Sequence, residues 1–556
     1  MWNNISNCLF WDLSPVDSRI QPHAEEKILS PQRPFRNDRT TCLVYQGKDF
    51  SCLRSCNTLK KRKFLRDAAL YSSSLFFTRF LLSIRGILIP KLLGPAQYGL
   101  YNSLLLIPEY VLHVHLGTLD ALKREIPFCY GRKDLARASL IRNTAFFQYV
   151  FTTSCSVVII LLITFFLRNR LMPSVFYALG LICVWIFFLS FETFFDQVAR
   201  TDSRFDILAR TEIFASLTGF IIMLLMILTW GLYGLLGSLI LISMLKAGYI
   251  FRGGHYRIAW QWDFQELKRL LKIGFPMVSG VILATVFNSV DRFIIIVYLE
   301  SMELGYYALA LTVLSFLLII MNGTYGVLEP RIYRLYGEKG NIEAIRPLVL
   351  EALSGMTLFF PLILGLIYIV FPLLVTFFLP KYLPSLTCIR IMVLGSFFFI
   401  FQRGTYNFII AVNRQAFIVK VECILIGISY LTGYLLVKQG WGIEGVALAT
   451  MGSNALGGLI FLVFTLSVLF NRPGEWLIYS RRLFFPFLLV VPLLILMDHF
   501  WILSGDWRND LVTVSLKGGG LLLLMSPFLW RLKEKMKNLQ HLGFTENHTE
   551  PTGSLD

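Results

Sequence analysis

The chain has 556 residues, of which 55% are hydrophobic, and it carries a formal net charge of +17. Apolar segments of about 20 residues, the length that crosses a bilayer, recur from Leu70 to Trp530 and exclude a soluble multidomain protein. Lys and Arg residues lie in short loops between these segments and form no separate basic face, so nucleic acid is excluded as a partner.

The chain begins with a polar segment, residues 1–66, that contains Pro and lacks the apolar core of a secretory signal. We expect this segment to be a disordered cytoplasmic tail. The Cys52-x-x-x-Cys56 spacing within it has no second pair and no nearby His, so it does not predict a zinc site.

Fourteen apolar segments follow and predict an all-α polytopic membrane protein. We assign spans one to six to an N-lobe (67–250), spans seven to twelve to a C-lobe (251–470), and the last two to an appended pair (471–530). Residues 531–556 form a second cytoplasmic tail. The predicted spans cover residues 70–90, 99–119, 143–167, 174–197, 208–229, 232–250, 273–299, 304–326, 347–372, 385–411, 416–437, 442–470, 483–503 and 511–530.

Lys and Arg divide unevenly between the two sides that these spans define. About 33 lie on the side that carries both tails, and about seven lie on the other side. By the positive-inside rule, both termini are cytoplasmic in a protein that crosses the inner (plasma) membrane many times. Glu192 and Glu212 lie near the cytoplasmic ends of their spans, and we expect them to be solvated. The external loops are short, so an aqueous enzymatic domain has no place to fold.

The two halves of the chain repeat each other at an offset of 206 residues. The stretch LGTLDALKREIPFCYGRKD (116–134) aligns with NGTYGVLEPRIYRLYGEKG (322–340), and further upstream Gly99 aligns with Gly305. Six spans separate equivalent positions, so the repeats are parallel and related by an axis along the membrane normal. Two parallel six-helix lobes around a central cavity form the architecture of a transporter.

Three stretches carry a resemblance to a known family. They are IPKLLGPAQYGLYNSLLLI (89–107), the loop at 116–134, and VDRFIIIVYLESMELGYYALA (290–310). In their order and spacing they resemble the Wzx-like oligosaccharide flippases of the multidrug/oligosaccharidyl-lipid/polysaccharide exporter superfamily, over about residues 68–470. Residues 1–66 and 471–556 add nothing specific to this resemblance.

The resemblance implies a carrier that is not an enzyme. Such a carrier turns a polyprenyl-pyrophosphate-linked oligosaccharide from the cytoplasmic to the outer leaflet by alternating access, in the biosynthesis of a surface polysaccharide such as O-antigen or exopolysaccharide. Its partners are this lipid-linked oligosaccharide, membrane lipids, and the polysaccharide polymerase and export machinery. No cofactor is implied. A proton gradient, a sodium gradient and the membrane potential all remain open as the driving force.

Charged residues inside the spans are the candidate site residues, because a charge at the bilayer centre is costly. Arg85 and Asp291 occupy equivalent positions of the two repeats. Guanidinium groups suit pyrophosphate, because their planar forks bind phosphate oxygens in pairs and stay charged. Asp291 either holds a coupling cation or proton, or pairs with an Arg of another helix. The substrate-binding candidates are Arg79, Arg85, Arg292, Arg390, Arg403 and Asn288. Asn288, Asn322 and Asn407 either form hydrogen bonds with sugars or form hydrogen bonds between helices.

Two other functions within the same superfamily remain open. A lipid II flippase would match the fourteen spans, and a cation-coupled multidrug antiporter would favour acidic residues in its cavity. A metal site is not expected from Glu109, His113 and His115, because a further ligand is missing. The sequence contains no Walker loop, catalytic triad or zinc signature, so we do not expect an enzyme.

Overall fold

The computed structural model describes residues 50–254, 256, 258–470, 472–500 and 506–544. The predicted membrane spans all lie in one compact unit, which begins at Arg62. Helix α1 (Phe50–Val111) begins within the predicted tail. The prediction of disorder is therefore wrong for residues 50–66, which contain no Gly or Pro to interrupt a helix. The rest of that tail, residues 1–49, lies outside the described residues.

Two long helices each contain a pair of predicted spans. Helix α1 is broken at Gly94, which has φ +74° and ψ 169° and is followed by Pro95. Helix α5 (Phe205–Gly254) is broken in the same way at Gly231, where φ is +56°. Glycine adopts this left-handed region at little cost. The chain therefore turns back at these two residues, and each helix yields two antiparallel spans.

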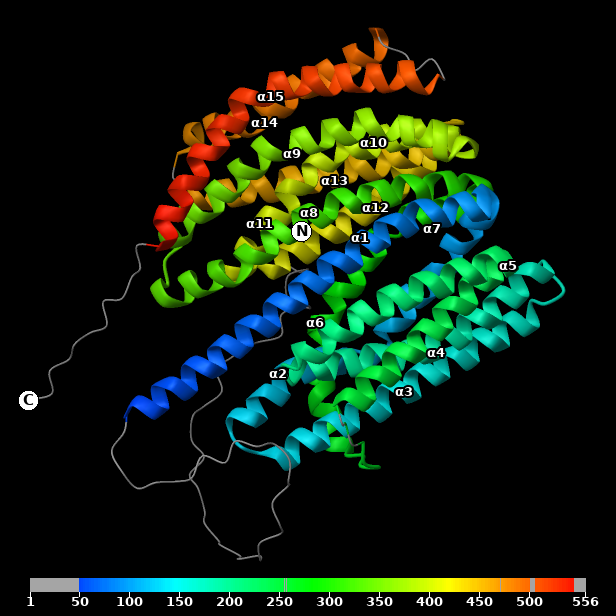
Figure 1. Ribbon diagram of the computed structural model, residues 1–556, viewed down its shortest axis with the longest axis vertical. Coiled ribbons are helices and arrows are strands. Elements are labelled where there is room, and N and C mark those ends of the chain that lie inside the picture. Colours follow the sequence, from blue (N-terminus) through cyan, green and yellow to red (C-terminus); the bar gives the residue numbers. More distant parts are fainter. Residues whose placement is uncertain (1–49, 255, 257, 471, 501–505, 545–556) are drawn as a thin grey trace, which may run out of the picture. The chain divides into compact units, whose positions relative to one another are not determined.

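The described residues form helices and contain no β-strand. Figure 1 shows α3, α4 and α5 together in one group and α8 to α13 in another, with α14 and α15 beside α9. The remaining helices are α2 (Thr118–Gly131), α3 (Leu135–Phe166), α4 (Pro173–Thr201), α6 (Phe264–Phe287), α7 (Val290–Tyr298), α8 (Ser301–Lys339), α9 (Ile342–Phe378), α10 (Leu386–Gly395), α11 (Phe399–Ala411), α12 (Gln415–Lys438), α13 (Gly442–Leu469), α14 (Pro473–Phe500) and α15 (Trp507–Phe544). Short 3-10 turns cover Leu112–His115, Pro380–Ser385 and Ser396–Phe398.

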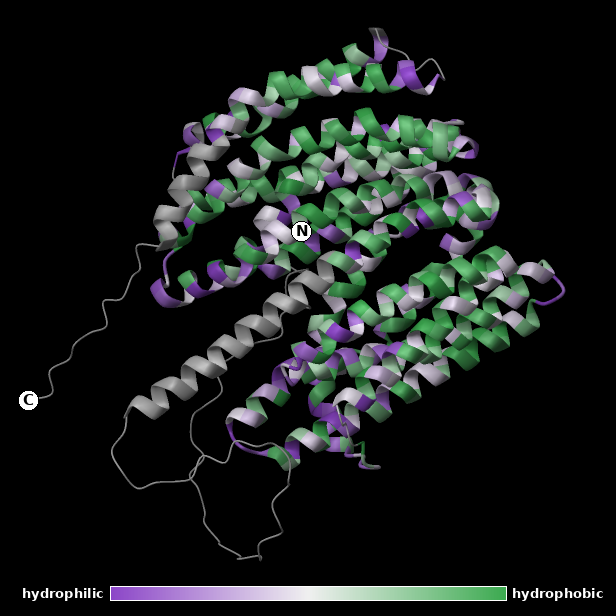
Figure 2. Ribbon diagram, viewed as in Figure 1, coloured by the Kyte–Doolittle hydropathy of each residue, from purple (hydrophilic) through white to green (hydrophobic). Residues whose placement is uncertain are grey.

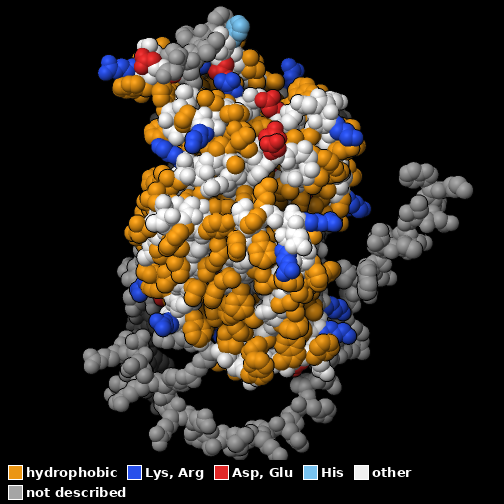
Figure 3. Space-filling model, turned by 90° about the vertical axis from the view of Figure 1, so that its right-hand side faces the viewer, with side chains coloured by type: hydrophobic (Ala, Val, Ile, Leu, Met, Phe, Trp, Pro, Cys, Tyr) orange, Lys and Arg blue, Asp and Glu red, His pale blue; other side chains and the backbone are white. Residues whose placement is uncertain are grey.

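These helices account for the predicted spans. Within the described part of the chain, 11 helices are long and apolar enough to cross a membrane, with the double-span α5 counted once. Span seven is divided into α6 and α7 at Asn288 and Ser289. Figure 2 shows hydrophobic residues along most of the helix lengths and hydrophilic ones gathered toward their ends. Hydrophobic side chains also predominate on the face in Figure 3. We call the side of the spans whose loops carry most of the Lys and Arg the basic side.

The two repeats meet at a pair of equivalent glycines. A Cβ atom on Gly99 would lie 1.7 Å from the carbonyl oxygen of Ser301, and one on Gly305 would lie 2.0 Å from that of Pro95. The same offset of 206 residues relates Pro95 to Ser301 and Gly99 to Gly305. The two contacts are thus exchanged by the operation that relates the repeats, as parallel repeats require. This close backbone contact closes the lobes on the side opposite the basic side.

Candidate functional site

Arg292 forms an ion pair between the two repeats. Its guanidinium donates two hydrogen bonds to the carboxylate of Glu109, from Nη1 to Oε1 at 2.8 Å and from Nη2 to Oε2 at 2.7 Å. The Arg292 side chain is 13% exposed and that of Glu109 is 40% exposed. Because Glu109 lies on α1 and Arg292 on α7, the pair fastens the lobes together. In this conformation a phosphate group would have to displace Glu109 to reach Arg292.

Asp291, the neighbour of Arg292, is buried inside the C-lobe. One carboxylate oxygen accepts a hydrogen bond from the hydroxyl of Tyr307 at 2.7 Å, and the other accepts one from the backbone N–H of Arg292 at 2.7 Å. Only 3% of Asp291 is exposed. No cation of another helix pairs with it among the described residues. One alternative, a pair between Asp291 and an Arg of another helix, is therefore not found among the described residues, where Tyr307 is the partner. The other alternative, a coupling role, remains a prediction.

Arg85 of α1 is an intramembrane cation without a partner. Its Nε and Nη2 atoms are buried and have no hydrogen-bond acceptor among the described residues. The guanidinium lies beside α5, where a Cβ atom on Gly219 would come within 3.0 Å of Nη2. Tyr101 lies close enough for its hydroxyl group to interact electrostatically with the Arg85 guanidinium. Arg85 and Tyr101 are the repeat equivalents of Asp291 and Tyr307, so each repeat places a charge beside a tyrosine at this position.

Two of the remaining three arginine candidates, Arg79 and Arg390, have different surroundings from Arg85 and Arg292. Arg79 is exposed on α1. The contact with α5 at this level of α1 is made by its neighbour Thr78, whose hydroxyl lies 2.7 Å from that of Ser216. Arg390 of α10 pairs with Asp498 of α14 at 3.0 Å. Arg390 thus joins the C-lobe to the appended pair, which is the role of a packing residue.

Asn288 also has a local partner. Its side-chain amide donates to the backbone carbonyl of Ala284 at 2.7 Å, at the point where α6 ends. The same carbonyl also accepts the backbone N–H of Asn288 at 3.0 Å, so the side-chain amide adds a second bond at the end of α6. The side chain is exposed and retains an acceptor oxygen that this bond does not use.

Arg403 lies in a polar pocket of about 200 Å³ between α8 and α11. No ion pair joins its guanidinium to a carboxylate among the described residues, although Glu329 lines the same pocket. The Tyr325 hydroxyl is buried there without a hydrogen-bond partner. The pocket lies in the halves of these spans nearer the basic side. Its lining residues are Asn322, Tyr325, Gly326, Glu329, Tyr333, Arg403, Tyr406, Asn407 and Ile410.

This pocket was only partly predictable from the sequence. Arg403, Asn322 and Asn407 are predicted site residues, and the structure brings all three together. The tyrosines of the lining were missed because an aromatic residue in an apolar span indicates packing. The spacing of Asn322, Tyr325, Glu329 and Tyr333 along α8 places them on one helix face, which is the signal that could have found them.

A buried ion cluster corrects one expectation. Lys246 of α5 pairs with Glu192 of α4 at 3.1 Å and with Glu212 of α5 at 2.9 Å. The three side chains are between 13% and 16% exposed. Glu192 and Glu212 are therefore not solvated, because the fold brings both to one ammonium group within the N-lobe.

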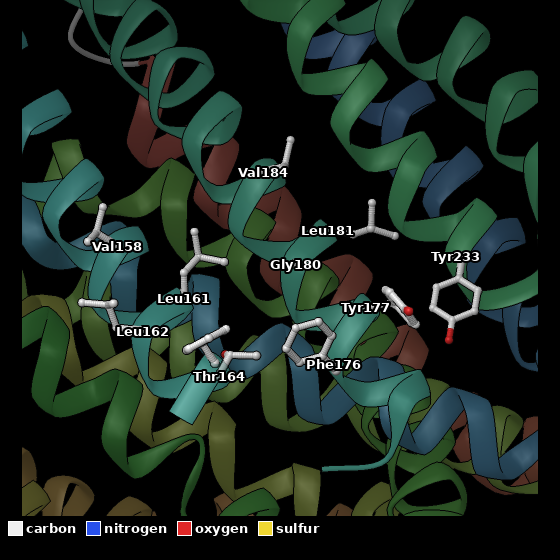
Figure 4. Close-up of a pocket in the computed structure, with 11 residues that line it drawn as sticks. Val158, Leu161, Leu162, Thr164, Phe176, Tyr177, Gly180, Leu181, Val184 and Tyr233 are labelled. Atoms are coloured by element: carbon white, nitrogen blue, oxygen red, sulfur yellow. The ribbon is translucent and has the colours of Figure 1, made fainter. Parts of the chain in front are cut away.

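A further pocket, of about 700 Å³, is apolar. Figure 4 shows Leu161 and Phe176, from α3 and α4, and Tyr233 of α5 on its walls. Its lining contains no charged side chain. Such a pocket suits hydrocarbon, so the charged and polar groups of a transported head group would have to bind elsewhere.

Comparison with known proteins agrees with this architecture. The model of a family described as polysaccharide biosynthesis protein matches residues 88–387. A structure titled lipid II flippase MurJ, inward closed conformation, is 17% identical, with a TM-score of 0.62 over 83% of this chain and 99% of that chain. An inward-facing multidrug resistance MATE family transporter of the MOP superfamily is 14% identical, with a TM-score of 0.56 over 70% of this chain and 94% of that one. These likenesses confirm the two-lobed membrane fold. No curated protein matches the sequence.

Proposed function

The chain belongs to the polysaccharide biosynthesis protein family, and on this premise we propose that it flips a polyprenyl-pyrophosphate-linked oligosaccharide across the membrane. The two-lobed transporter fold supports this proposal, because lobes that rock around a central site expose that site to one side at a time. A flippase forms and breaks no covalent bond. Its residues need only bind the head group, shield it from hydrocarbon and release it.

The polar pocket around Arg403 is the observation that carries the proposal. An unpaired guanidinium within a membrane protein suits an anionic ligand, because its fork binds phosphate oxygens in pairs. Asn322 and Asn407 supply amide donors and acceptors for sugar hydroxyls. The tyrosines offer flat apolar faces together with hydroxyl groups. We therefore assign the pyrophosphate and the first sugars to this pocket.

Arg85 provides the matching charge on the other repeat. Its buried Nε and Nη2 atoms have no acceptor within the described ranges, whereas Arg292 is bound to Glu109 and Arg390 to Asp498. In the mechanism that we propose, the head group enters from the basic side, which the positive-inside rule makes cytoplasmic. Separation of Gly99 from Gly305 and of Glu109 from Arg292 then opens the opposite side. The prenyl chain stays in lipid throughout.

The test uses purified protein in liposomes that contain a fluorescent polyprenyl-pyrophosphate oligosaccharide. Protein-dependent loss of fluorescence to a membrane-impermeant quencher reports flipping. We expect Arg403→Ala to slow flipping by about tenfold to a hundredfold, the value of one or two hydrogen bonds to a charged group. The control is Arg414→Ala, which removes an exposed arginine of the basic side.

The same liposomes separate the proposal from its alternatives. Equal rates for the wild type, Arg403→Ala and Arg414→Ala would remove the pocket from the proposal. Faster flipping of a lipid II analogue than of the oligosaccharide would make the chain a lipid II flippase. Transport of a soluble cationic dye driven by a cation gradient, without exposure of the lipid, would make it a multidrug antiporter.

A further inference from the structure

We propose that a basic pocket between α9, α14 and α15 binds the phosphate groups of a membrane lipid. The pocket has a volume of about 660 Å³ and lies at the basic side, where α14 begins and α15 leaves the membrane. Arg481 and Arg482 of α14 and Arg531 of α15 line it. This site goes beyond the proposed transport function, because it is formed by the appended pair and the outer helix α9.

The three arginines in this pocket have no anionic partner in the part of the chain that the structure describes. No ion pair connects them to a carboxylate among the described residues, and no Asp or Glu lines the pocket. Like charges gathered in one pocket repel each other, so an anion that enters relieves repulsion as well as gaining contacts. Guanidinium groups bind phosphate oxygens in pairs. Basic pockets between transmembrane helices on the cytoplasmic side are known binding places for lipid phosphates.

The remaining walls divide the pocket into a polar and an apolar part. Thr357 of α9 and Tyr479 of α14 line the polar part, with hydroxyl groups that donate to backbone carbonyls of α9. Phe485 lies one helical turn beyond Arg481, on the same face of α14 and deeper in the membrane. Its ring lies 6.1 Å from that of Phe528 on α15. This order of groups, first basic and then aromatic, matches an amphiphile whose phosphates lie at the membrane surface and whose chains enter the bilayer.

An ion network near the opposite membrane surface holds the walls of the pocket in place. Asp498 lies about 24 Å along α14 from Arg482, at 1.5 Å per residue. It accepts hydrogen bonds from Lys517 of α15 at 3.0 Å and from Tyr368 of α9 at 2.9 Å, and it pairs with Arg390. The three helices that form the pocket are thus fastened to one another at their far ends. The pocket is a built concavity rather than a loop that carries basic residues.

Three guanidinium groups indicate a head group with two phosphate charges. Both a glycerolipid with two phosphodiesters and a prenyl diphosphate have this chemistry. The test measures lipid retention by native mass spectrometry on full-length, delipidated protein. Separate samples receive a diphosphatidyl glycerolipid, a prenyl diphosphate, phosphatidylcholine or inorganic diphosphate. We expect one lipid of a dianionic class to stay bound at one copy per protein, and neither phosphatidylcholine nor inorganic diphosphate to do so.

Variants locate the binding site. We expect the Arg481→Ala/Arg482→Ala double variant to weaken retention of the dianionic lipid at least about tenfold. The matched control is Arg210→Ala/Arg252→Ala, which removes two exposed arginines of the basic side from α5. If the alanine variant does not fold, the Arg481→Lys/Arg482→Lys variant keeps the charge, loses the paired geometry and is expected to retain the lipid more weakly.

The outcomes either support or overturn the site. Retention of the glycerolipid identifies a membrane-lipid site, and retention of the prenyl diphosphate identifies a site for a carrier lipid. Both support the proposal when the loss follows Arg481 and Arg482. An equal loss in the control would show diffuse attraction between surface charges and would overturn it, as would retention of phosphatidylcholine to the same extent. None of these measurements depends on flipping, so the proposed function and this site can fail separately.

Discussion

The substitution Glu109→Gln should open the lobes on the side opposite the basic side. Gln has nearly the same shape as Glu but no charge, so the two hydrogen bonds to Arg292 lose their ionic component. The closed state, in which Gly99 and Gly305 are in contact, is then stabilised less by the ion pair that joins the repeats. Because the pair joins the N-lobe to the C-lobe only while the lobes are closed, its loss shifts the equilibrium toward separated lobes.

The magnitude follows from the geometry. Two unit charges about 4 Å apart interact by about 4 kcal/mol at an effective dielectric constant of about 20. The Glu109 side chain is 40% exposed, so solvent screening reduces this value, and we take about 2 kcal/mol. Such a change shifts the equilibrium between closed and separated lobes by about thirtyfold. A population of separated lobes that is about 1% in the wild type would become about a quarter of the molecules.

Distances between spin labels measure this shift. Cysteines that replace Arg170 of the N-lobe and Lys438 of the C-lobe place one label on each lobe, on the side opposite the basic side. Double electron–electron resonance should show a second, longer distance in Glu109→Gln. The control, Glu338→Gln, removes an exposed ion pair within α8 and should leave the distances unchanged.

The charge-swapped variant Glu109→Arg/Arg292→Glu separates the loss of the pair from local damage. It keeps one cation and one anion at the contact, so it should restore much of the closed distance. An unchanged distance distribution in Glu109→Gln would refute the reasoning, because the ion pair would then contribute nothing to closure. A longer distance in Glu338→Gln as well would show that the labels respond to charge rather than to the lobes.

Three further substitutions test other parts of the structure. Gly99→Val places a Cβ atom 1.7 Å from a backbone carbonyl of the other repeat, so cysteine cross-linking between the closed lobes should fall sharply. The control is Gly427→Ala, whose Cβ atom meets nothing within 4 Å, and it should leave the cross-linking unchanged. Asp498→Asn leaves two cations without their anion and should lower the free energy of unfolding by about 3–5 kcal/mol, visible as a lower melting temperature. Lys246→Met leaves two carboxylates side by side without their cation, so the melting temperature should fall, whereas Lys133→Met, at an exposed loop position, should leave it unchanged.

The sequence was sufficient to predict the helical spans and the repeat. These features depend on local composition and on spacing along the chain, which a single sequence displays directly. The alignment of Gly99 with Gly305 even identified the residues that meet between the lobes, although their contact was not foreseen. Two glycines without side chains at equivalent positions allow two backbones to approach, and this is the physical meaning of that alignment.

The partners of the charged residues could not be predicted in the same way. Arg292 and Glu109 are separated by 183 residues, and Arg390 reaches Asp498 only because α14 packs on the C-lobe. Such pairs are fixed by the tertiary arrangement and leave no local pattern. The sequence therefore did not show which intramembrane arginines have an anionic partner. Only the structure divides them into paired ones and unpaired ones, of which Arg85 is buried without an acceptor among the described residues.

This division bears on how a flippase could release an anion that it binds tightly. A pyrophosphate held only by fixed, unpaired arginines would bind well and leave slowly. Glu109 offers a competing anion for Arg292, and the two anions cannot occupy the same guanidinium fork. Binding of the head group at Arg292 would therefore require the lobes to lose their ion pair, and return of Glu109 would expel the head group. In the proposed mechanism, a single carboxylate that exchanges with the substrate would couple closure of the lobes to release.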